Sequence, residues 1–142
     1  MRKSVIFVSF IVALVLVIVT YGNKESIDTP KINVIYQGNI INTTIGESNI
    51  KGLFTNVMTS TDYTIINDCN TVQQGKTIDY SFENKPNNCT VILTKQDNDT
   101  TMLFNNKGSI ETKDLKGEYI VKIRGRWNNN YCSYMFKIKV VP

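Results

Sequence analysis

The sequence predicts an all-β domain built as a sandwich of antiparallel strands, and three observations support this prediction. Most of the chain alternates apolar and polar residues with a period of two, as strands with one buried face do. β-branched and aromatic residues fill these runs, and clusters of Asn, Gly, Pro and Asp separate them. After the first residues, no segment has the period of a helix longer than one turn. About seven to nine strands follow one another at the spacing typical of a sandwich.

The amino-terminal segment differs from the rest of the chain. Arg2 and Lys3 precede an almost unbroken apolar run over residues 5–19. Cations stay on the cytoplasmic side of a membrane while an apolar run inserts. The run is longer than the core of most signal peptides and shorter than a full membrane span. We therefore expect residues 1–22 to form one hydrophobic helix, either a signal peptide cleaved after Gly22 or a retained anchor, with the following domain on the extracytoplasmic face of the cell membrane or secreted.

The remaining chain predicts one linker and one domain. Residues 23–30 are polar and end in Pro30, as expected for a short linker. Residues 31–142 are enough for one modest hydrophobic core and too few for two domains. The net charge of the whole chain is +4, and half of it comes from Arg2 and Lys3. Global charge therefore predicts no particular partner for the exported part.

The first predicted element of the domain is a hairpin. Ile32, Val34 and Tyr36 alternate before a Gln-Gly-Asn turn, and residues 40–45 form the expected return strand. Residues 46–70 are less regular and predict no definite strand. Regular alternation resumes further on, and the strands predicted there cover residues 77–82, 89–93, 102–104 and 109–112.

The carboxyl-terminal pair of strands carries enough pattern to predict its register. Both strands have one apolar face, and these faces coincide when Trp127 opposes Cys132. The same register places Ile123 opposite Phe136 and Val121 opposite Ile138. The connection then has an even number of residues, either Asn129 and Asn130 or residues 128–131. Asparagine tolerates the positive φ that such turns require.

Residues 114–119 (Asp-Leu-Lys-Gly-Glu-Tyr) carry a resemblance to a known architecture. They resemble the Asp-x-x-Gly-x-Tyr corner that opens the sixth strand of immunoglobulin-like sandwiches, where a buried tyrosine hydroxyl ties the loop to the strand. The resemblance implies an immunoglobulin-like antiparallel β-sandwich. An immunoglobulin domain proper has a cysteine at the position of Val121 and a tryptophan on an earlier strand, whereas Trp127 comes later. The likeness is therefore to the architecture and not to that family.

A second resemblance covers residues 31–140. The segments that carry it are 71–75 (TVQQG), 78–82 (IDYSF), Pro86, 117–119 (GEY), Trp127 and 133–138 (SYMFKI). This frame is similar to small exported domains of Firmicute bacteria, which are usually lipoproteins or membrane-anchored and have no known function. Where such proteins often carry Gly-Ser-Tyr-Cys-Trp, this chain has Gly-Glu-Ser-Asn-Ile at residues 46–50. The resemblance implies an exported, membrane-anchored domain and assigns no activity.

The cysteines and the missing histidines limit the chemistry that the chain can perform. Cys69, Cys89 and Cys132 have no zinc-ligand spacing, and the chain has no histidine. We expect the strand at residues 119–127 to separate Cys89 from Cys132 by more than the ~7 Å limit for a disulfide, which predicts three free thiols. A nucleophile would lack its usual histidine base. The sequence predicts no enzyme activity, no metal site and no cofactor, and residues 97–99 (Asp-Asn-Asp) indicate a solvated turn.

A basic stripe on the outer face of the last hairpin is the first candidate binding feature, and its residues are Lys122, Arg124, Arg126, Lys137 and Lys139. Such a stripe suits an anionic cell-envelope polymer, lipid headgroups or an acidic surface protein. The alternative is a solvated sheet face, which normally carries Lys and Arg. Nucleic acid is not expected as a partner, because the face offers few aromatic side chains for stacking bases.

Trp127 is the second candidate, because it lies beside three consecutive asparagines at one end of the predicted sandwich. An indole with neighbouring amides suits a sugar or a peptide, and the alternative is a tryptophan that closes the core. Residues 124–127 also resemble the Arg-Pro-Trp loop of chagasin-type cysteine-protease inhibitors, and residues 42–46 their Asn-Pro-Thr-Thr-Gly loop, both without the proline. We expect a non-catalytic binding module of unknown ligand, membrane-tethered or secreted. A secreted protease inhibitor is the alternative.

Overall fold

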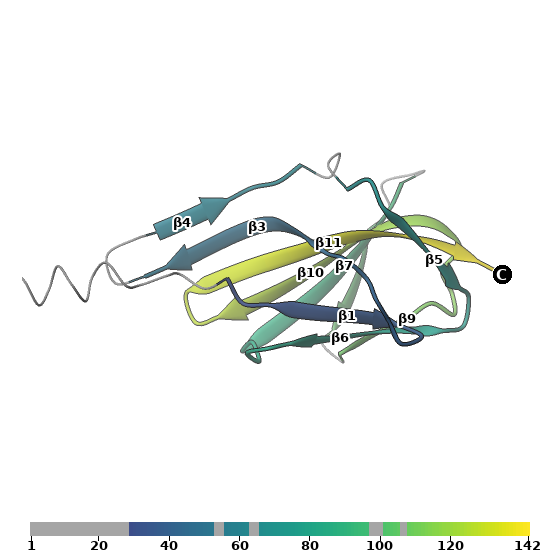
Figure 1. The fold of residues 1–142 in the computed structure, drawn as a ribbon, viewed down its shortest axis with the longest axis horizontal. Helices are drawn as coiled ribbons and strands as arrows, with labels where there is room; N and C mark the ends of the chain where they lie inside the picture. Colours follow the sequence, from purple (N-terminus) through teal and green to yellow (C-terminus); the bar gives the residue numbers. More distant parts are fainter. Residues whose placement is uncertain (1–28, 53–55, 63–65, 97–100, 106–107) are drawn as a thin grey trace, which may run out of the picture.

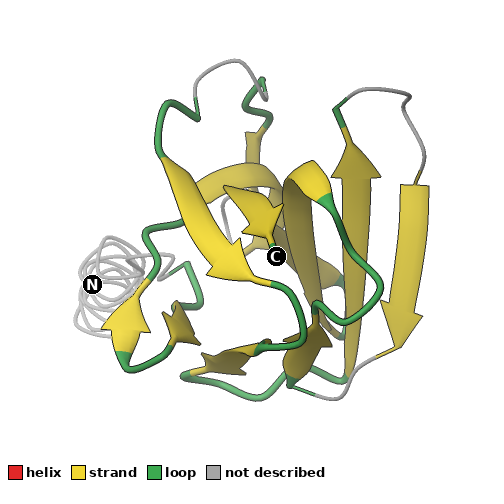
Figure 2. Ribbon diagram, turned by 90° about the vertical axis from the view of Figure 1, so that its right-hand side faces the viewer, coloured by secondary structure: helices red, strands yellow, loops and turns green. Residues whose placement is uncertain are grey.

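The computed structural model describes residues 29–52, 56–62, 66–96, 101–105 and 108–142, and these residues form a two-layer β-sandwich. One layer is a four-stranded sheet with the order β2-β1-β6-β9. The other is a seven-stranded sheet with the order β4-β3-β11-β10-β7-β8, and β5 also pairs with β11. Figures 1 and 2 show the two layers from the side and from the end that carries the carboxyl terminus. The predicted all-β sandwich is confirmed.

The strands have the following bounds. In the four-stranded sheet they are β1 (Ile32–Tyr36), β2 (Asn39–Ile40), β6 (Thr77–Phe82) and β9 (Ser109–Glu111). In the seven-stranded sheet they are β3 (Thr44–Lys51), β4 (Asn56–Thr59), β5 (Cys69–Gln73), β7 (Asn88–Lys95), β8 (Thr101–Asn105), β10 (Gly117–Trp127) and β11 (Asn130–Val141).

The sandwich has more strands than predicted, and it is not wholly antiparallel. The extra strands come mainly from the irregular stretch that predicted none, since most of β3, all of β4 and the start of β5 lie in it. β5 runs parallel to the second half of β11. The predicted helix at residues 1–22 and most of the linker lie outside the described residues. None of the described segments forms a helix with the length and apolar character that crossing a membrane requires.

The first hairpin has the predicted turn and a shorter return strand than predicted. Gln37 and Gly38 form the turn with φ values of 49° and 81°, and Tyr36 pairs with Asn39. The return strand β2 ends at Ile40 instead of continuing to residue 45. Ile41 is only 4% exposed, and its N–H donates to the carbonyl of Val34. Burial of Ile41 in the core draws the chain away from the first sheet, and β3 then joins the second.

The connection in the last hairpin has an even number of residues, as predicted, but the register is shifted by two residues. Trp127 pairs with Asn130 across a two-residue turn of Asn128 and Asn129, and Asn128 has a φ of 52°. Cys132 therefore opposes Gly125, and the predicted pair of Trp127 with Cys132 is wrong. The pairs predicted for Ile123 and Val121 shift in the same way, to Tyr134 and Phe136. A shift of two residues leaves every side chain on its predicted face, which is why the pattern alone did not distinguish the two registers.

Gly125 makes room for the side chain of Trp127. A Cβ atom on Gly125 would lie 2.5 Å from Cη2 of Trp127 and 3.1 Å from Cε1 of Phe82. The indole ring packs edge-on against Phe82 with ring centroids 5.4 Å apart, and its Nε1–H donates to the carbonyl of Asn84 at 3.0 Å. Trp127 therefore closes one end of the core, as in the second of the two interpretations drawn from the sequence.

The same part of β10 separates two cysteines, as predicted. Gly125 pairs with Cys132 on one side and with Cys89 on the other, so β10 lies between the strands that carry them. Both thiols are buried and free, and Cys69 is exposed and free on β5. Two ladder spacings amount to about 9.6 Å, which is beyond the reach of a disulfide.

The predicted tyrosine corner is present at the start of β10. Tyr119 is 3% exposed, and its hydroxyl accepts a hydrogen bond from the N–H of Lys116 at 3.3 Å. The same hydroxyl donates to the carbonyl of Lys116 at 3.2 Å. Gly117 has a φ of 95°, and Leu115 is 2% exposed beside the corner. The loop before β10 is thus held to the strand by one side chain, because a buried hydroxyl must find partners.

We expect Tyr119→Phe to lower the free energy of unfolding by about 1–2 kcal/mol, since the ring stays while the hydroxyl loses both hydrogen bonds. The measurement is a urea titration followed by circular dichroism. The matched control is Tyr131→Phe, because the Tyr131 hydroxyl makes no hydrogen bond with the described residues and Tyr131 is only partly buried. Equal midpoints for the two variants would show that the corner contributes nothing to stability.

We expect Gly125→Ala to destabilise the fold by about 1–3 kcal/mol, because the added methyl group overlaps the six-membered ring of Trp127. Trp127→Phe removes the two overlapping ring atoms. The cost of Gly125→Ala should therefore be smaller in a Trp127→Phe background, and a double-mutant cycle of unfolding free energies measures the difference. Additive effects in this cycle would contradict the close packing of Gly125 and Trp127.

Candidate functional site

The outer face of β10 and β11 carries the predicted cations on one side of the seven-stranded sheet. Across the hairpin Lys122 pairs with Met135, Ile120 with Lys137, and Glu118 with Lys139, so these side chains share a face. The apolar residues between them face the core. This face is where the structure brings charged groups together, and it contains the candidate site.

A β-bulge in β3 places an additional residue, Glu47, on this face. Between Cys132 and Tyr134 the register shifts, so that Gly46 and Glu47 both oppose Ser133. The Ser133 hydroxyl accepts from the N–H of Glu47 at 2.6 Å and donates to its carbonyl at 2.9 Å. Bulges commonly redirect side chains in this way. A Cβ atom at position 46 would lie 2.9 Å from Sδ of Met135 and 3.0 Å from Oγ of Ser133, so these side chains would have to shift to admit a larger residue.

The carboxylate of Glu47 reaches across β11 and pairs with two cations of β10. Its Oε1 lies 2.6 Å from Nζ of Lys122, and its Oε2 bonds Nη2 of Arg124. Lys122 is only 7% exposed, so its charge is compensated within the protein. The hydrogen bond from Lys122, with further attraction from both cations, lowers the pKa of Glu47 despite partial burial. Glu47 therefore stays ionised at neutral pH.

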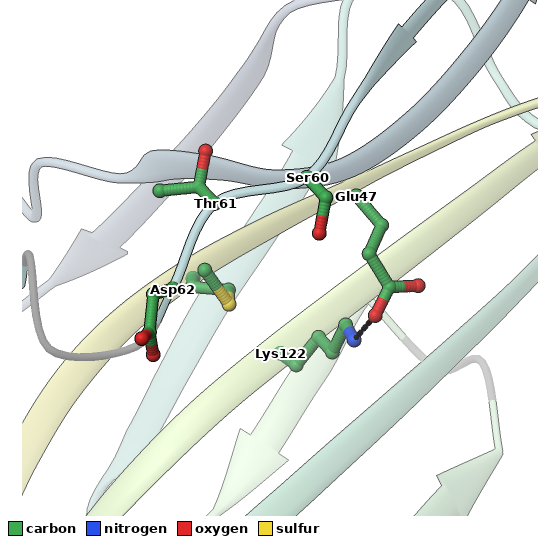
Figure 3. Close-up of a pocket in the computed structure, with 6 residues that line it drawn as sticks. Glu47, Ser60, Thr61, Asp62 and Lys122 are labelled. Atoms are coloured by element: carbon green, nitrogen blue, oxygen red, sulfur yellow. Dashed lines mark hydrogen bonds and ion pairs between the residues drawn. The ribbon is translucent and has the colours of Figure 1, made fainter.

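A pocket of about 340 Å³ lies over this ion pair. Its lining residues are Glu47, Ser60, Thr61, Asp62, Lys122 and Met135. Figure 3 shows that the side chains of Ser60 and Asp62 point toward the sheet surface that carries Lys122, while that of Thr61 points away. The N–H of Thr61 donates to the carbonyl of Gly46 at 3.0 Å, which holds this wall of the pocket against the bulge.

The position of the pocket follows from the pairing of β11. The edge of β11 that faces away from β10 pairs with β3 up to Met135 and with β5 from Lys137 onward. β3 is antiparallel to β11 and β5 is parallel to it. Both strands therefore start near residue 136 of β11 and run away from it in opposite directions, which leaves a break between them. The pocket opens at this break in the sheet edge, with Met135 in its lining.

Two buried polar atoms on the same face have no hydrogen-bond partner among the described residues. They are Nε of Arg124, a donor, and Oδ1 of Asn49, an acceptor. Arg124 lies two residues after Lys122 on β10, and Asn49 lies two residues after Glu47 on β3, so both are next to residues that line the pocket. The guanidinium of Arg124 also lies 5.3 Å from the ring centroid of Tyr131. Unsatisfied buried polar groups are rare in proteins and often mark a position for water or a ligand.

The predicted basic stripe is divided by acidic side chains. Lys122 and Arg124 share Glu47, and Lys139 pairs with Glu118 at 3.2 Å. Of the six predicted binding residues, Arg126 and Lys137 are the cations that enter no ion pair in the described part of the chain. Lys122 is not the free surface residue that its outward position indicated, because Glu47 and the wall of the pocket cover it.

The structure also places the residues of the inhibitor-like segments. Residues 124–127 belong to β10 and not to a loop, and the indole of Trp127 packs onto Phe82. Of residues 42–46, the last three lie in β3. Sequence reasoning missed Glu47, Ser60 and Asp62. The available signal was Gly46, since an isolated glycine within a strand indicates a bulge or a close approach of another chain segment.

Comparisons with protein family models, with curated proteins and with solved structures find no match to this chain. Among the residues that the structure describes, no three acidic or cysteine side chains are grouped as metal ligands would be. The predicted turn at residues 97–99 lies outside the described residues. The candidate site therefore rests on the geometry of the pocket.

We expect Glu47→Gln to lower the free energy of unfolding at pH 7 by about 1–3 kcal/mol, because Lys122 would be buried beside a neutral amide. Solvent screens part of the effect, since the Glu47 side chain is 38% exposed. The matched control is Glu118→Gln, which removes an exposed ion pair and should cost less than about 0.5 kcal/mol.

The same pair of proteins gives a pH test. The pKa of Glu47 is lowered in the folded chain, so its stabilisation is fully present above its ordinary value of 4.5 and is lost as the pH falls through the lower, folded value. The advantage of the parent over Glu47→Gln should thus shrink below about pH 4.5. Denaturant titrations from pH 7 to pH 3 measure it, and a constant difference would contradict the ion-paired state.

Proposed function

We propose that this chain is a non-catalytic binding module, tethered outside the cytoplasm by its amino-terminal segment, that holds a small polar ligand on the outer face of its seven-stranded sheet. The observation that carries the proposal is the pocket over the Glu47–Lys122 ion pair. Its volume of about 340 Å³ is within the usual range of small-molecule sites. Its rigid frame, formed by the bulge and the ion pair, suits a preformed binding site.

The charges around the pocket favour a ligand without net charge. Glu47 and Asp62 contribute two carboxylates, and Lys122 and Arg124 contribute two cations, so the cluster is balanced. A polyanion or a polycation would have to displace one of these partners. A ligand rich in hydroxyl or amide groups, or a zwitterion, donates and accepts hydrogen bonds at once and matches a lining of both donors and acceptors. The unpaired Arg124 Nε and Asn49 Oδ1 extend this mixed character along the face.

The environment of the thiols supports a binding role over a catalytic one. Burial raises the pKa of Cys89 and Cys132, and partial desolvation together with the charge of Glu118 raises the pKa of Cys69. A catalytic cysteine needs the opposite shift, which produces a reactive thiolate near neutral pH. Nζ of Lys122 lies 2.6 Å from Oε1 of Glu47, so this side chain is paired and is not available for nucleophilic attack.

The finer architecture that we propose is immunoglobulin-like, and it supports the same role. β7, β10 and β11 are near neighbours in one sheet, β1, β6 and β9 follow one another in the other, and β5 runs parallel beside β11. The tyrosine corner opens β10. Sandwiches of this kind are common in cell-surface proteins. The resemblance to exported domains of Firmicute bacteria and the apolar residues 5–19 support the tether.

The proposal predicts that the pocket, and no other part of the surface, determines ligand binding. A thermal-shift screen of the chain with neutral sugars, amino sugars, amino acids and short peptides should find a stabilising compound. A ligand at about 100 times its dissociation constant adds about 2.7 kcal/mol, which raises the melting temperature by several degrees. The double variant Ser60→Ala/Asp62→Asn should lose that shift.

The matched control is Ser81→Ala/Asp79→Asn, which makes the same two changes at exposed positions of the four-stranded sheet. It should keep the shift of the parent. Loss of binding in both double variants, or in neither, would show that the pocket is not the binding site. The absence of any stabilising compound in the four classes would contradict the proposed ligand chemistry.

A further inference from the structure

The end of the sandwich where the domain begins is rich in unpaired cations. Four exposed basic residues lie there, one in each chain segment that reaches this end, namely Lys31, Lys51, Lys85 and Arg126. None of them takes part in an ion pair in the described part of the chain. We call these four residues the entry-end cations. The one exposed acid in the same segments is Glu83.

The register places these four residues at one end. Lys31 directly precedes β1, whose first residue Ile32 pairs with Phe82 at the end of β6, and Lys85 lies in the connection that follows. Arg126 pairs with Asn88 at the start of β7. The N–H of Lys51, the last residue of β3, donates to Oδ1 of Asn130 beside the β10–β11 turn. In Figure 1 the start of β1 and this turn lie at the left, and the carboxyl terminus lies at the right.

The chain also enters the domain at this end, and the entry point is fixed. The hydroxyl of Tyr134, which is 3% exposed, donates a hydrogen bond to the carbonyl of Pro30. The N–H of Glu83 donates to the carbonyl of Lys31 at 3.0 Å. Eight linker residues, 23–30, separate this point from the apolar segment. Fully extended, they span at most about 29 Å, so a tethered domain stays close to its membrane.

The opposite end of the sandwich has a different charge pattern. Exposed lysines there, such as Lys76, Lys113 and Lys116, alternate with the acids Glu111 and Asp114. In the sequence, the linker carries Lys24 against Glu25 and Asp28, and when these charges are counted with the entry-end cations and Glu83, the cations remain in excess. Trp127 lies at the same end and is partly exposed. Tryptophan is the side chain that proteins most often place at a membrane interface, together with tyrosine.

We propose that the entry-end cations and Trp127 form a contact surface for anionic lipid headgroups, which holds the domain upright with its carboxyl-terminal end away from the membrane. This inference rests on the tether of the proposed function and adds an orientation to it. Each Lys or Arg close to a negatively charged membrane surface raises the partition constant of the protein onto that membrane roughly fivefold. The pocket over Glu47 and Lys122 then lies on the side of an upright domain, open to ligands.

The single tryptophan of the chain reports this contact without any labelling. The full chain is reconstituted into vesicles whose lipids carry a nitroxide quencher on the headgroup, either all zwitterionic or with one third anionic phosphatidylglycerol. Emission of Trp127 should be quenched more strongly on the anionic vesicles. The excess should fall as salt rises from 0.1 M to 1 M, because the Debye length shrinks from about 10 Å to about 3 Å.

Two charge variants distinguish binding through the entry-end cations from a general attraction between the domain and anionic lipids. Lys51→Gln/Lys85→Gln/Arg126→Gln removes three entry-end cations and should reduce quenching to the level found with zwitterionic vesicles. Lys76→Gln/Lys113→Gln/Lys116→Gln removes the same charge from the opposite end and should behave like the parent. All six side chains are exposed and enter no ion pair with the residues that the structure describes, so both variants should melt like the parent. Equal quenching on both vesicle types, or equal effects of the two triple variants, would overturn the proposal.

Flotation of the same vesicles distinguishes this inference from the proposed function. If the full chain floats with the vesicles and the quenching of Trp127 does not depend on lipid charge, the tether stands and the oriented contact is wrong. If the full chain stays in the supernatant with both vesicle types, the tether itself is wrong, and the orientation is wrong with it.

Discussion

The division of one edge of β11 between two partners determines most of what is distinctive in this fold. β11 pairs with β10 from Asn130 to Val140, while its other edge pairs first with β3 and then with β5. Each backbone N–H and C=O along that edge needs a partner, so two separate segments of the chain are recruited to it. Their opposite directions leave a break at residue 136, and the candidate pocket opens there.

The bulge at Gly46 and Glu47 follows from the same constraint and converts a basic face into a balanced site. Lys122 is too buried to remain unpaired, because an isolated buried charge is far more costly than a compensated one. The extra residue in β3 turns Glu47 toward Lys122, and the Ser133 hydroxyl satisfies the backbone groups that the bulge releases. One carboxylate therefore pairs with two cations and fixes the floor of a pocket.

The two functional surfaces that we infer use different parts of the sandwich and do not compete. The pocket lies midway along the outer face of the seven-stranded sheet, on rigid strands that preorganise its polar groups. The entry-end cations lie in turns and strand ends at the end where the chain enters the domain, which the proposed tether would bring close to the membrane. A tethered module that stands on one end leaves its faces free, which is the arrangement that ligand capture at a surface requires.

The sequence by itself determined most of the strands outside residues 46–70, their apolar faces, and where the tyrosine corner lies, because these features depend on neighbours within a few positions. It also determined that the connection in the last hairpin has an even number of residues. The tertiary structure decided the two-residue shift in that hairpin, since the two registers have identical apolar faces and the alternation of residues does not distinguish them. It alone decided that Glu47 meets Lys122 and Arg124, which lie 75 and 77 residues away in the chain. Such contacts depend on which strands share an edge, and no local pattern specifies that choice.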